Sequence, residues 1–213
     1  MNPANQPQQS IGAAILAGGA NRRMGQNKAL LRLTPDGPTL IEVVVARLTE
    51  AGYPAPLLIA NASGDYAFLG LPAYPDDVEG KGALGGILTA LRRAPYERVL
   101  VVACDMPALN PALLRHMASL PSGNDAYVPT WVSTSGEVQV EPLHAIYSRT
   151  SIPVIERRIS EDHLKLGDLL AALNVRYLTE PEVREYDPSL TSFSNINTPQ
   201  EWASLAAQRE FTV

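Results

Sequence analysis

The chain has 213 residues, a formal net charge of -5, and a hydrophobic content of 46%. This acidic balance argues against binding to nucleic acid or to an anionic membrane surface, both of which require a basic face. No apolar run approaches the ~20 residues that span a bilayer. The single cysteine, Cys104, excludes an internal disulfide framework. We expect it to be a small buried residue in a reducing, cytoplasmic compartment.

The first half of the chain alternates between short apolar runs and helical patterns. Residues 1–10 are polar, and we expect them to form a disordered tail. The apolar runs have the length and β-branched content of buried strands and lie at 11–17, 55–60 and 98–104. Helical patterns lie between or after them, at 39–52, 82–94 and 110–120. This alternation predicts an α/β fold, a three-layer α/β/α sandwich with a mostly parallel sheet.

Two of these helices carry clear start signals. Thr39 and Glu42 match a capping box, in which each residue satisfies a backbone N–H of the other. Asn110 is a suitable N-cap, followed by Pro111 in the first helical position.

The second half of the chain is less regular. Strands are expected at 125–131, 141–147 and 175–179, and helices at 149–160 and 165–173. The polar stretch 132–140 between the first two strands is expected to form a hairpin or a mobile lid. A further helix is expected to begin at Thr198.

A glycine-rich, cationic stretch follows the first predicted strand, where residues 16–31 read LAGGANRRMGQNKALL. Glycines at a strand-to-helix turn let backbone N–H groups approach an anion closely, and neighbouring cations suggest phosphate. The stretch matches neither the G-x-G-x-x-G fingerprint of dinucleotide folds nor the P-loop. A glycine turn with solvated arginines is the alternative.

The same stretch resembles, position for position, the L-A-G-G-x-x-x-R-M-G-x-x-K-x-L-L signature of the molybdenum cofactor guanylyltransferases, the MobA family. The resemblance implies a Rossmann-like nucleotidyltransferase domain over 11–213, whose loop wraps the triphosphate of GTP. It assigns nucleotide binding to Leu16, Ala17, Gly18, Gly19 and Lys28. Arg23 occupies the family's arginine position and is expected to be catalytic together with Lys28, while Arg22 is expected to meet the phosphate acceptor.

An aspartate, Asp105, directly follows the third predicted strand in VVACDMP. Open α/β sheets bind ligands at the carboxyl ends of their strands, and a carboxylate there is a hard ligand suited to Mg²⁺. The family's C-D-x-P motif makes Asp105, by resemblance, the catalytic residue that holds magnesium at the nucleotide. The alternative is a turn or helix-capping aspartate ahead of Pro107.

Two further positions resemble the family on its nucleotide side. Asn61 ends the second predicted strand, where the family places an asparagine against the nucleotide, although asparagine is equally an ordinary turn former. The family also has an aspartate near the adjacent pair Asp76 and Asp77. We favour Asp76 as the nucleotide-binding residue.

The expected acceptor side rests on two imperfect matches. The segment GALGG at 82–86 resembles the family's G-P-L-A-G and assigns Gly82 to the acceptor. Close packing of a glycine-bearing helix against the sheet is the alternative. The segment SNINTPQEW at 194–202 resembles N-x-N-T-P-E-E and assigns Asn195 and Asn197 to the acceptor.

The resemblance implies transfer of GMP from GTP to the terminal phosphate of molybdopterin, with Mg²⁺ as cofactor and pyrophosphate as the second product. Residues 11–120 would form the nucleotide-binding half and residues 121–213 the acceptor-binding half. A molybdoenzyme or an accessory GTPase is the expected class of protein partner. The alternatives are a cytidylyltransferase, a transferase for another small phosphate, or a non-catalytic nucleotide-binding relative. Gly18 and Asn197 favour guanine, because cytidylyl relatives usually read L-A-A-G and carry an aspartate at those positions.

The three histidines, His116, His144 and His163, have no spaced partners for a metal and no neighbouring nucleophile. We expect all three to be structural or solvated. His144 lies in the half expected to bind the acceptor.

Overall fold

The computed structural model describes residues 11–18, 27–32, 36–194 and 201, and the structural statements below concern this part of the chain. The tail predicted at 1–10 and the helix predicted from Thr198 lie outside it.

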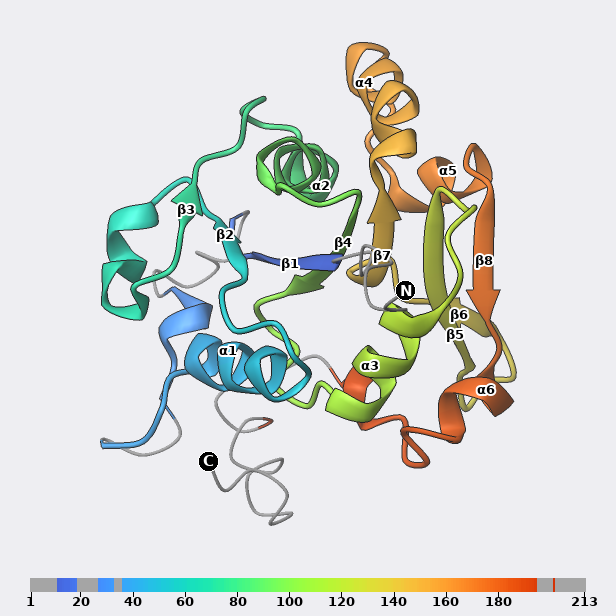
Figure 1. Cartoon of the computed structure of the whole chain (residues 1–213), viewed down its shortest axis with the longest axis horizontal. Helices are drawn as coiled ribbons and strands as arrows, with labels where there is room; N and C mark the ends of the chain where they lie inside the picture. Colours follow the sequence, from blue (N-terminus) through green and yellow to red (C-terminus); the bar gives the residue numbers. More distant parts are fainter. Residues whose placement is uncertain (1–10, 19–26, 33–35, 195–200, 202–213) are drawn as a thin grey trace, which may run out of the picture.

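One sheet runs through the described part of the chain (Figure 1). Its eight strands are β1 (Ile11–Leu16), β2 (Leu57–Ile59), β3 (Ala73–Tyr74), β4 (Arg98–Ala103), β5 (Ala126–Val132), β6 (Val138–Val140), β7 (His144–Ser148) and β8 (Val175–Leu178). They lie in the order β3-β2-β1-β4-β7-β5-β6, and β8 pairs with β5. Strands β1 to β4 are parallel, whereas β7 runs antiparallel to both β4 and β5. Because β5 and β8 therefore run with β1 to β4, the sheet is mostly parallel, as predicted.

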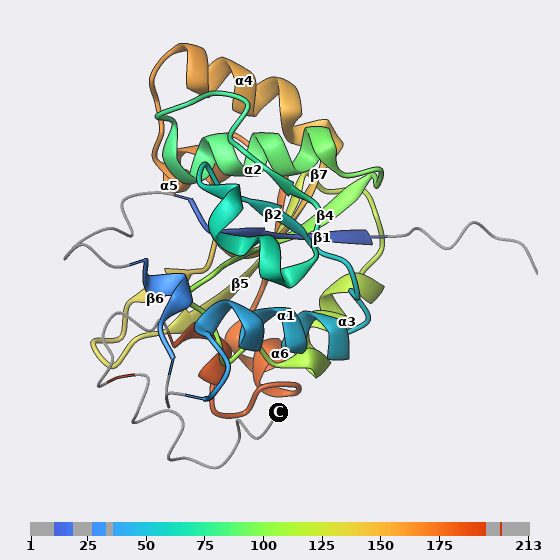
Figure 2. The same ribbon diagram turned by 90° about the vertical axis from the view of Figure 1, so that its left-hand side faces the viewer.

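Helices cover both faces of this sheet and complete the predicted three layers (Figures 1 and 2). On one face lie α1 (Leu40–Glu50), α3 (Pro111–Ser119) and α6 (Glu180–Arg184). On the other lie α2 (Gly82–Arg93), α4 (Ile152–Ser160) and α5 (Leu166–Ala171). Four short 3₁₀ helices are also described: η1 (Lys28–Leu30), η2 (Ser63–Leu69), η3 (Arg149–Ser151) and η4 (Thr191–Phe193).

The side chains of β1 alternate between two hydrophobic layers, as the pleat requires. Ala13 and Ile15 pack with the buried residues of α1 and α3. Ala14 and Leu16 pack with those of α2 and α4. Because β1 is central and buried on both faces, its end is held firmly, and this end opens into the candidate site.

The helix starts predicted at Thr39 and Asn110 are confirmed. The Thr39 backbone N–H donates to Glu42 Oε2 at 2.7 Å, and the Glu42 backbone N–H donates to Thr39 Oγ1 at 3.4 Å. Asn110 caps α3 by accepting a hydrogen bond from the Ala112 backbone N–H, with Pro111 in the first turn.

Some elements differ from the predictions. The strand expected at 141–147 begins only at His144, because the residues before it form a turn in which the His144 N–H donates to the Glu141 carbonyl. Pro142 favours that turn, since it has no N–H to give to a sheet. Neither the two-residue strand β3 nor the short helix α6 was predicted, because both are too short to show a periodic pattern.

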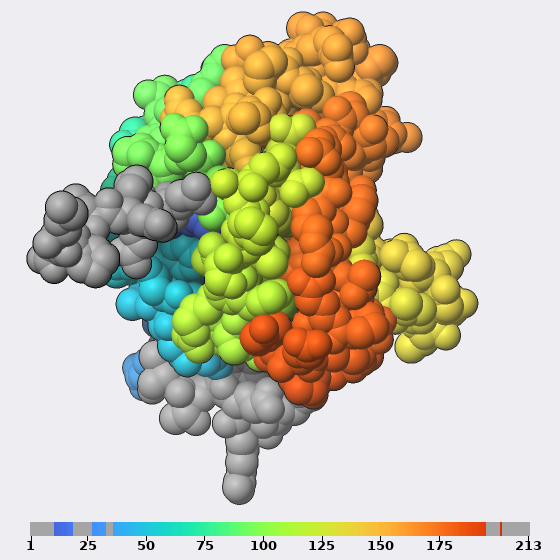
Figure 3. Space-filling model, turned by 45° about the vertical axis from the view of Figure 1, so that its right-hand side comes forward, coloured from blue at the N-terminus to red at the C-terminus, as the bar shows by residue number. Residues whose placement is uncertain are grey.

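The polar stretch 132–140 forms a hairpin, because β6 pairs antiparallel with β5. This segment, yellow in Figure 3, projects from the body of the molecule. The Val138 side chain is 68% exposed there. Among the helices described, none combines the length and the apolar character that crossing a membrane would require.

Candidate active site

Polar residues gather at one edge of the sheet, where β1, β3 and β4 end and the antiparallel β7 begins. Gly18 follows β1, Asp76 follows β3, Asp105 follows β4, and Glu141 lies in the turn before β7. These four residues line one cavity of about 270 Å³, together with Gly82 at the start of α2. The predicted residues Gly18, Asp76 and Asp105 therefore lie at the carboxyl ends of the parallel strands, as expected.

An ion pair joins the two residues expected to bind the triphosphate. Lys28 Nζ lies 3.0 Å from Asp105 Oδ2, although 77 positions separate the two residues in the chain. Their side chains are only 13% and 23% exposed. Lys28 begins η1, and the Asn27 side chain caps that turn by accepting from the Ala29 N–H. Lys28 and Asp105 are thus close enough to reach one polyphosphate.

A buried tyrosine, Tyr66 of η2, connects the two described ends of the glycine-rich loop. Its hydroxyl donates to the Ala17 carbonyl at 3.3 Å and lies 3.0 Å from the Asn27 Nδ2, which donates to it. Burial raises the pKa of Tyr66, so its hydroxyl remains a neutral donor. Because Asn27 caps the turn that carries Lys28, Tyr66 fixes the point from which the lysine extends.

We expect Tyr66→Phe to lower kcat/KM for GTP about tenfold, chiefly through KM. The ring would stay packed, but the Ala17 carbonyl and Asn27 would lose a buried partner, at a typical cost of ~1 kcal/mol per hydrogen bond. Steady-state kinetics at varied GTP measure this effect. Tyr53→Phe is the matched control, because Tyr53 is also buried and its hydroxyl makes no hydrogen bond within the described residues. Equal KM values in the two variants would contradict the anchoring role.

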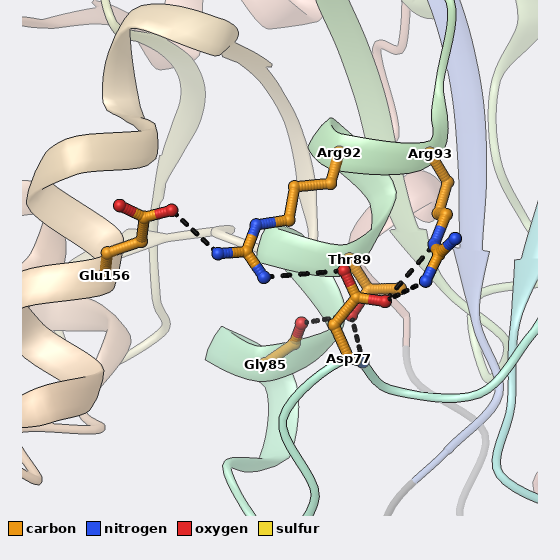
Figure 4. A network of polar contacts seen from close by, with 6 residues as sticks. All are labelled: Asp77, Gly85, Thr89, Arg92, Arg93 and Glu156. Carbon is orange, nitrogen blue, oxygen red and sulfur yellow. Dashed lines mark hydrogen bonds and ion pairs between the residues drawn. The ribbon is translucent and has the colours of Figure 1, made fainter.

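The structure separates the neighbouring aspartates Asp76 and Asp77. Asp76 lines the cavity, and its Oδ2 lies near Gly18. Asp77 turns away to α2, where it accepts from Arg93 Nε at 3.2 Å and from Arg92 at 3.5 Å (Figure 4). The Asp77 backbone N–H also donates to Thr89 Oγ1 at 2.9 Å. Asp77 therefore ties the loop to the helix, and Asp76 is the one directed at the ligand space.

Asn61 supports Asp76 instead of lining the cavity. The Asn61 Nδ2 donates to Asp76 Oδ2 at 3.1 Å, and the Asp76 backbone N–H donates to Asn61 Oδ1 at 2.9 Å. Burial raises the pKa of Asp76, while the hydrogen bond from Asn61 opposes this shift. The asparagine thus orients the carboxylate, and its own contact with a nucleotide stays a prediction.

The start of α2 forms another wall of the cavity. Gly82, Ala83 and Gly86 line it. A Cβ on Gly86 would lie 3.1 Å from the side chain of Leu16, so any larger residue here would force Leu16 or the helix to shift. Gly86 therefore serves the close packing of helix against sheet, which was the structural alternative, whereas Gly82 has open space around its Cβ position, adopts a left-handed φ of +55° and lines the cavity. The positive end of the helix dipole points toward the site, where it favours anions.

Several predicted site residues lie outside the described part of the chain, so their positions remain predictions. They are Gly19, Arg22, Arg23, Asn195 and Asn197.

Sequence reasoning missed Glu141, which lies in the cavity wall between the nucleotide-side residues and the second half of the chain. In the sequence it reads as the first residue of a strand, and nothing marks it as a ligand-binding residue. Only the turn before β7 and the antiparallel direction of that strand bring it to this edge.

His144 is fully buried in β7 and packs edge-on against the ring of Phe193, 5.4 Å between centroids. Burial lowers its pKa to about 4, while the charge of Asp187 and the Ser192 backbone oppose the shift. It does not line the cavity, so its described position is structural, as expected.

This burial predicts acid sensitivity. Because His144 must be neutral in the folded state, stability from this residue is complete above pH 6.5 and is lost as the pH falls toward 4. The loss amounts to roughly 3 kcal/mol at most. Urea unfolding at several pH values should show a shallower acid decline for His144→Leu than for the wild type. Parallel declines would contradict this explanation.

The residues of the cavity fit a magnesium ion bound mainly by substrate. No cluster of three or more His, Cys, Asp or Glu side chains capable of holding a metal occurs in the described residues. Mg²⁺ commonly takes one or two protein carboxylates and completes its shell with phosphate and water. Asp105 offers such a carboxylate beside the lysine expected to bind phosphate.

Comparison with known proteins identifies the family. The family model described as a MobA-like NTP transferase domain matches residues 13–177. A probable molybdenum cofactor guanylyltransferase from Carboxydothermus hydrogenoformans is 36% identical over 197 residues, covering 92% of this chain and 95% of the relative. A molybdenum cofactor guanylyltransferase from Desulfosudis oleivorans is 32% identical over 192 residues, covering 90% of this chain and 92% of the relative.

Among solved structures, the molybdopterin-guanine dinucleotide biosynthesis protein A from Archaeoglobus fulgidus has a TM-score of 0.76 and 29% identity, covering 93% of this chain and all of that one. A nucleotidyl transferase from Methanothermobacter thermautotroptrophicus, with a TM-score of 0.65 and 17% identity, shares the fold. The family model, the relatives and the strand-end site together lead to one conclusion: the chain is a nucleotidyltransferase that belongs to the MobA-like NTP transferase family.

Proposed function

We propose that the enzyme transfers GMP from GTP to the terminal phosphate of molybdopterin, forming molybdopterin guanine dinucleotide and releasing pyrophosphate. The observation that carries this proposal is the ion pair between Lys28, which follows the glycine-rich loop, and Asp105, which follows β4. The choice of substrates is supported by relatives named as guanylyltransferases, which this chain matches over nearly their whole length. A cytoplasmic location is part of the proposal and is supported by the single, buried cysteine.

The transfer reaction requires positioning of the substrates and neutralisation of their charges, but no general base. An oxygen of the acceptor phosphate attacks the α-phosphorus of GTP, a new P–O–P linkage forms, and the bond to the β-phosphate breaks. Because a phosphate monoester has a second pKa near ~6, the attacking oxygen is already largely ionised at neutral pH. No proton needs to be removed by the protein.

The main obstacle is repulsion between the two substrates. GTP carries about four negative charges and the acceptor phosphate about two, and two unit charges 4 Å apart repel by ~4 kcal/mol at an effective dielectric constant of 20. Lys28 and the positive end of α2 lower this repulsion. Asp105 would hold Mg²⁺, which supplies further charge neutralisation on the triphosphate. Asp76, on the Gly18 side of the cavity, would hold the nucleoside.

Pyrophosphate release with each nucleoside triphosphate and molybdopterin tests the proposal. Of the nucleoside triphosphates, only GTP should support rapid pyrophosphate release in the presence of molybdopterin. Preference for CTP would identify a cytidylyltransferase instead. Binding of GTP without pyrophosphate release from any nucleotide would identify a non-catalytic relative.

A further inference from the structure

Three carboxylates lie in a row along the edge of the sheet. Asp76 lies beside Gly18 at the end of β1, Asp105 follows β4, and Glu141 precedes β7. Because β1, β4 and β7 are adjacent in the sheet, Asp105 lies between the other two. Lys28 contacts the middle carboxylate, so phosphate is expected in the middle of the row. Glu141 therefore faces the part of the cavity beyond the phosphates.

The Glu141 side chain is held in a fixed orientation. Trp131 Nε1 donates to Glu141 Oε1 at 2.9 Å, and the Trp131 ring lies parallel to that of Phe193, 6.3 Å between centroids. The Glu141 backbone N–H donates to the Pro129 carbonyl at 3.1 Å. Oε2 accepts no hydrogen bond from any described residue, and Oε1 keeps a second lone pair beside the bond from Trp131, so both oxygens of the anchored carboxylate can accept from a ligand.

The surroundings of Glu141 suit a ligand that donates hydrogen bonds. Burial raises the pKa of Glu141, and the negative charge of Asp105 raises it further. The hydrogen bond from Trp131 opposes this shift. A phosphate would be repelled by this carboxylate, whereas N–H donors would stabilise its charged form. Pro142, Leu143 and Leu166 form apolar cavity wall nearby, which suits the faces of a flat ring.

The two proposed substrates carry the same donor pattern. Guanine and pterin both contain a 2-amino-4-oxopyrimidine ring, in which the amino group and the adjacent ring N–H point the same way and match the two oxygens of a carboxylate. We propose that Glu141 is the specificity residue for the acceptor and accepts hydrogen bonds from the amino group and ring N–H of its pterin. Asp76 has the corresponding place on the guanine side. This inference rests on the proposed function.

The first test is Glu141→Gln, which preserves the shape of the side chain but replaces an acceptor oxygen with a donor. The KM for molybdopterin should rise at least tenfold, while the KM for GTP stays unchanged. Glu137→Gln is the matched control, because Glu137 lies in the adjoining hairpin and is exposed to solvent. An unchanged KM for molybdopterin would overturn the assignment. So would a rise in the KM for GTP or in the Mg²⁺ requirement, because either would place Glu141 with the nucleotide.

A pair of inhibitors separates this inference from the proposed function. The probes are 6-hydroxymethylpterin phosphate and the matching lumazine, which has a carbonyl in place of the 2-amino group. The wild type should bind the pterin about tenfold more tightly, and Glu141→Gln should lose that preference. A preference retained in the variant would overturn the role of Glu141 alone. If neither probe inhibits the wild type while another phosphate acceptor is used, the pterin substrate is wrong and the inference fails with it.

Discussion

Replacing Asp105 with asparagine is expected to lower kcat by about 10³-fold, the largest single effect at this site. Asparagine preserves the size of the side chain but removes the charge that would anchor a divalent cation and that pairs with Lys28. The same variant should need more Mg²⁺ for half-maximal activity. Pyrophosphate release over a range of Mg²⁺ concentrations measures both effects.

A surface variant, Asp65→Asn, controls for the loss of one negative charge, because Asp65 is exposed on η2 and does not line the cavity. It should keep wild-type kcat. If purified, folded Asp105→Asn retained most of its activity, the aspartate could not be the metal ligand.

Replacing Lys28 with methionine is expected to lower kcat/KM for GTP about 10²-fold. Methionine keeps most of the apolar stem but removes the ammonium that lies 3.0 Å from Asp105 and is expected to neutralise the triphosphate. Both the affinity for GTP and the rate should fall, because the charge stabilises the bound ground state as well as the transition state. Titration calorimetry with GTP and steady-state kinetics measure the two contributions separately.

Lys81→Met is the comparison for this variant. The Lys81 ammonium is directed at the exposed Asp162, 2.8 Å away, and surface pairs of this kind contribute little to stability. GTP binding should therefore survive in Lys81→Met. Unaltered affinity and kinetics in Lys28→Met would remove the lysine from the site.

The central sheet was predictable because its buried strands are continuous apolar runs that alternate with capped helices. The α1 capping box, for example, is formed by a local pair of residues and appears directly in the sequence. The direction of β7 was not predictable in the same way, because it depends on pairing with residues of β4 that lie 42 to 50 positions away in the chain. The strand β3, with two residues, owes its existence to pairing with β2 alone.

The same distinction between local sequence signals and long-range contacts applies to the candidate site. Lys28 and Asp105 could be found because each lies in a local motif at a strand end, and the fold brings those ends together. Asp76 could be separated from Asp77 only through contacts with distant residues, Asn61 and Arg93. Tyr66 and Glu141 act through tertiary neighbours and belong to no local motif, so the sequence alone did not indicate them.

The reversed direction of β7 has a consequence for how this enzyme could change its second substrate. In the first half of the chain, the residues at the site edge of the sheet follow parallel strands. In the second half, the residue at this edge, Glu141, lies in a turn that precedes the antiparallel strand β7. That turn is continuous with the projecting hairpin, so insertions and deletions there would remodel the pocket proposed for the acceptor without shifting β1, β2 or β4. Acceptor choice and nucleotide choice could thus diversify independently within one scaffold.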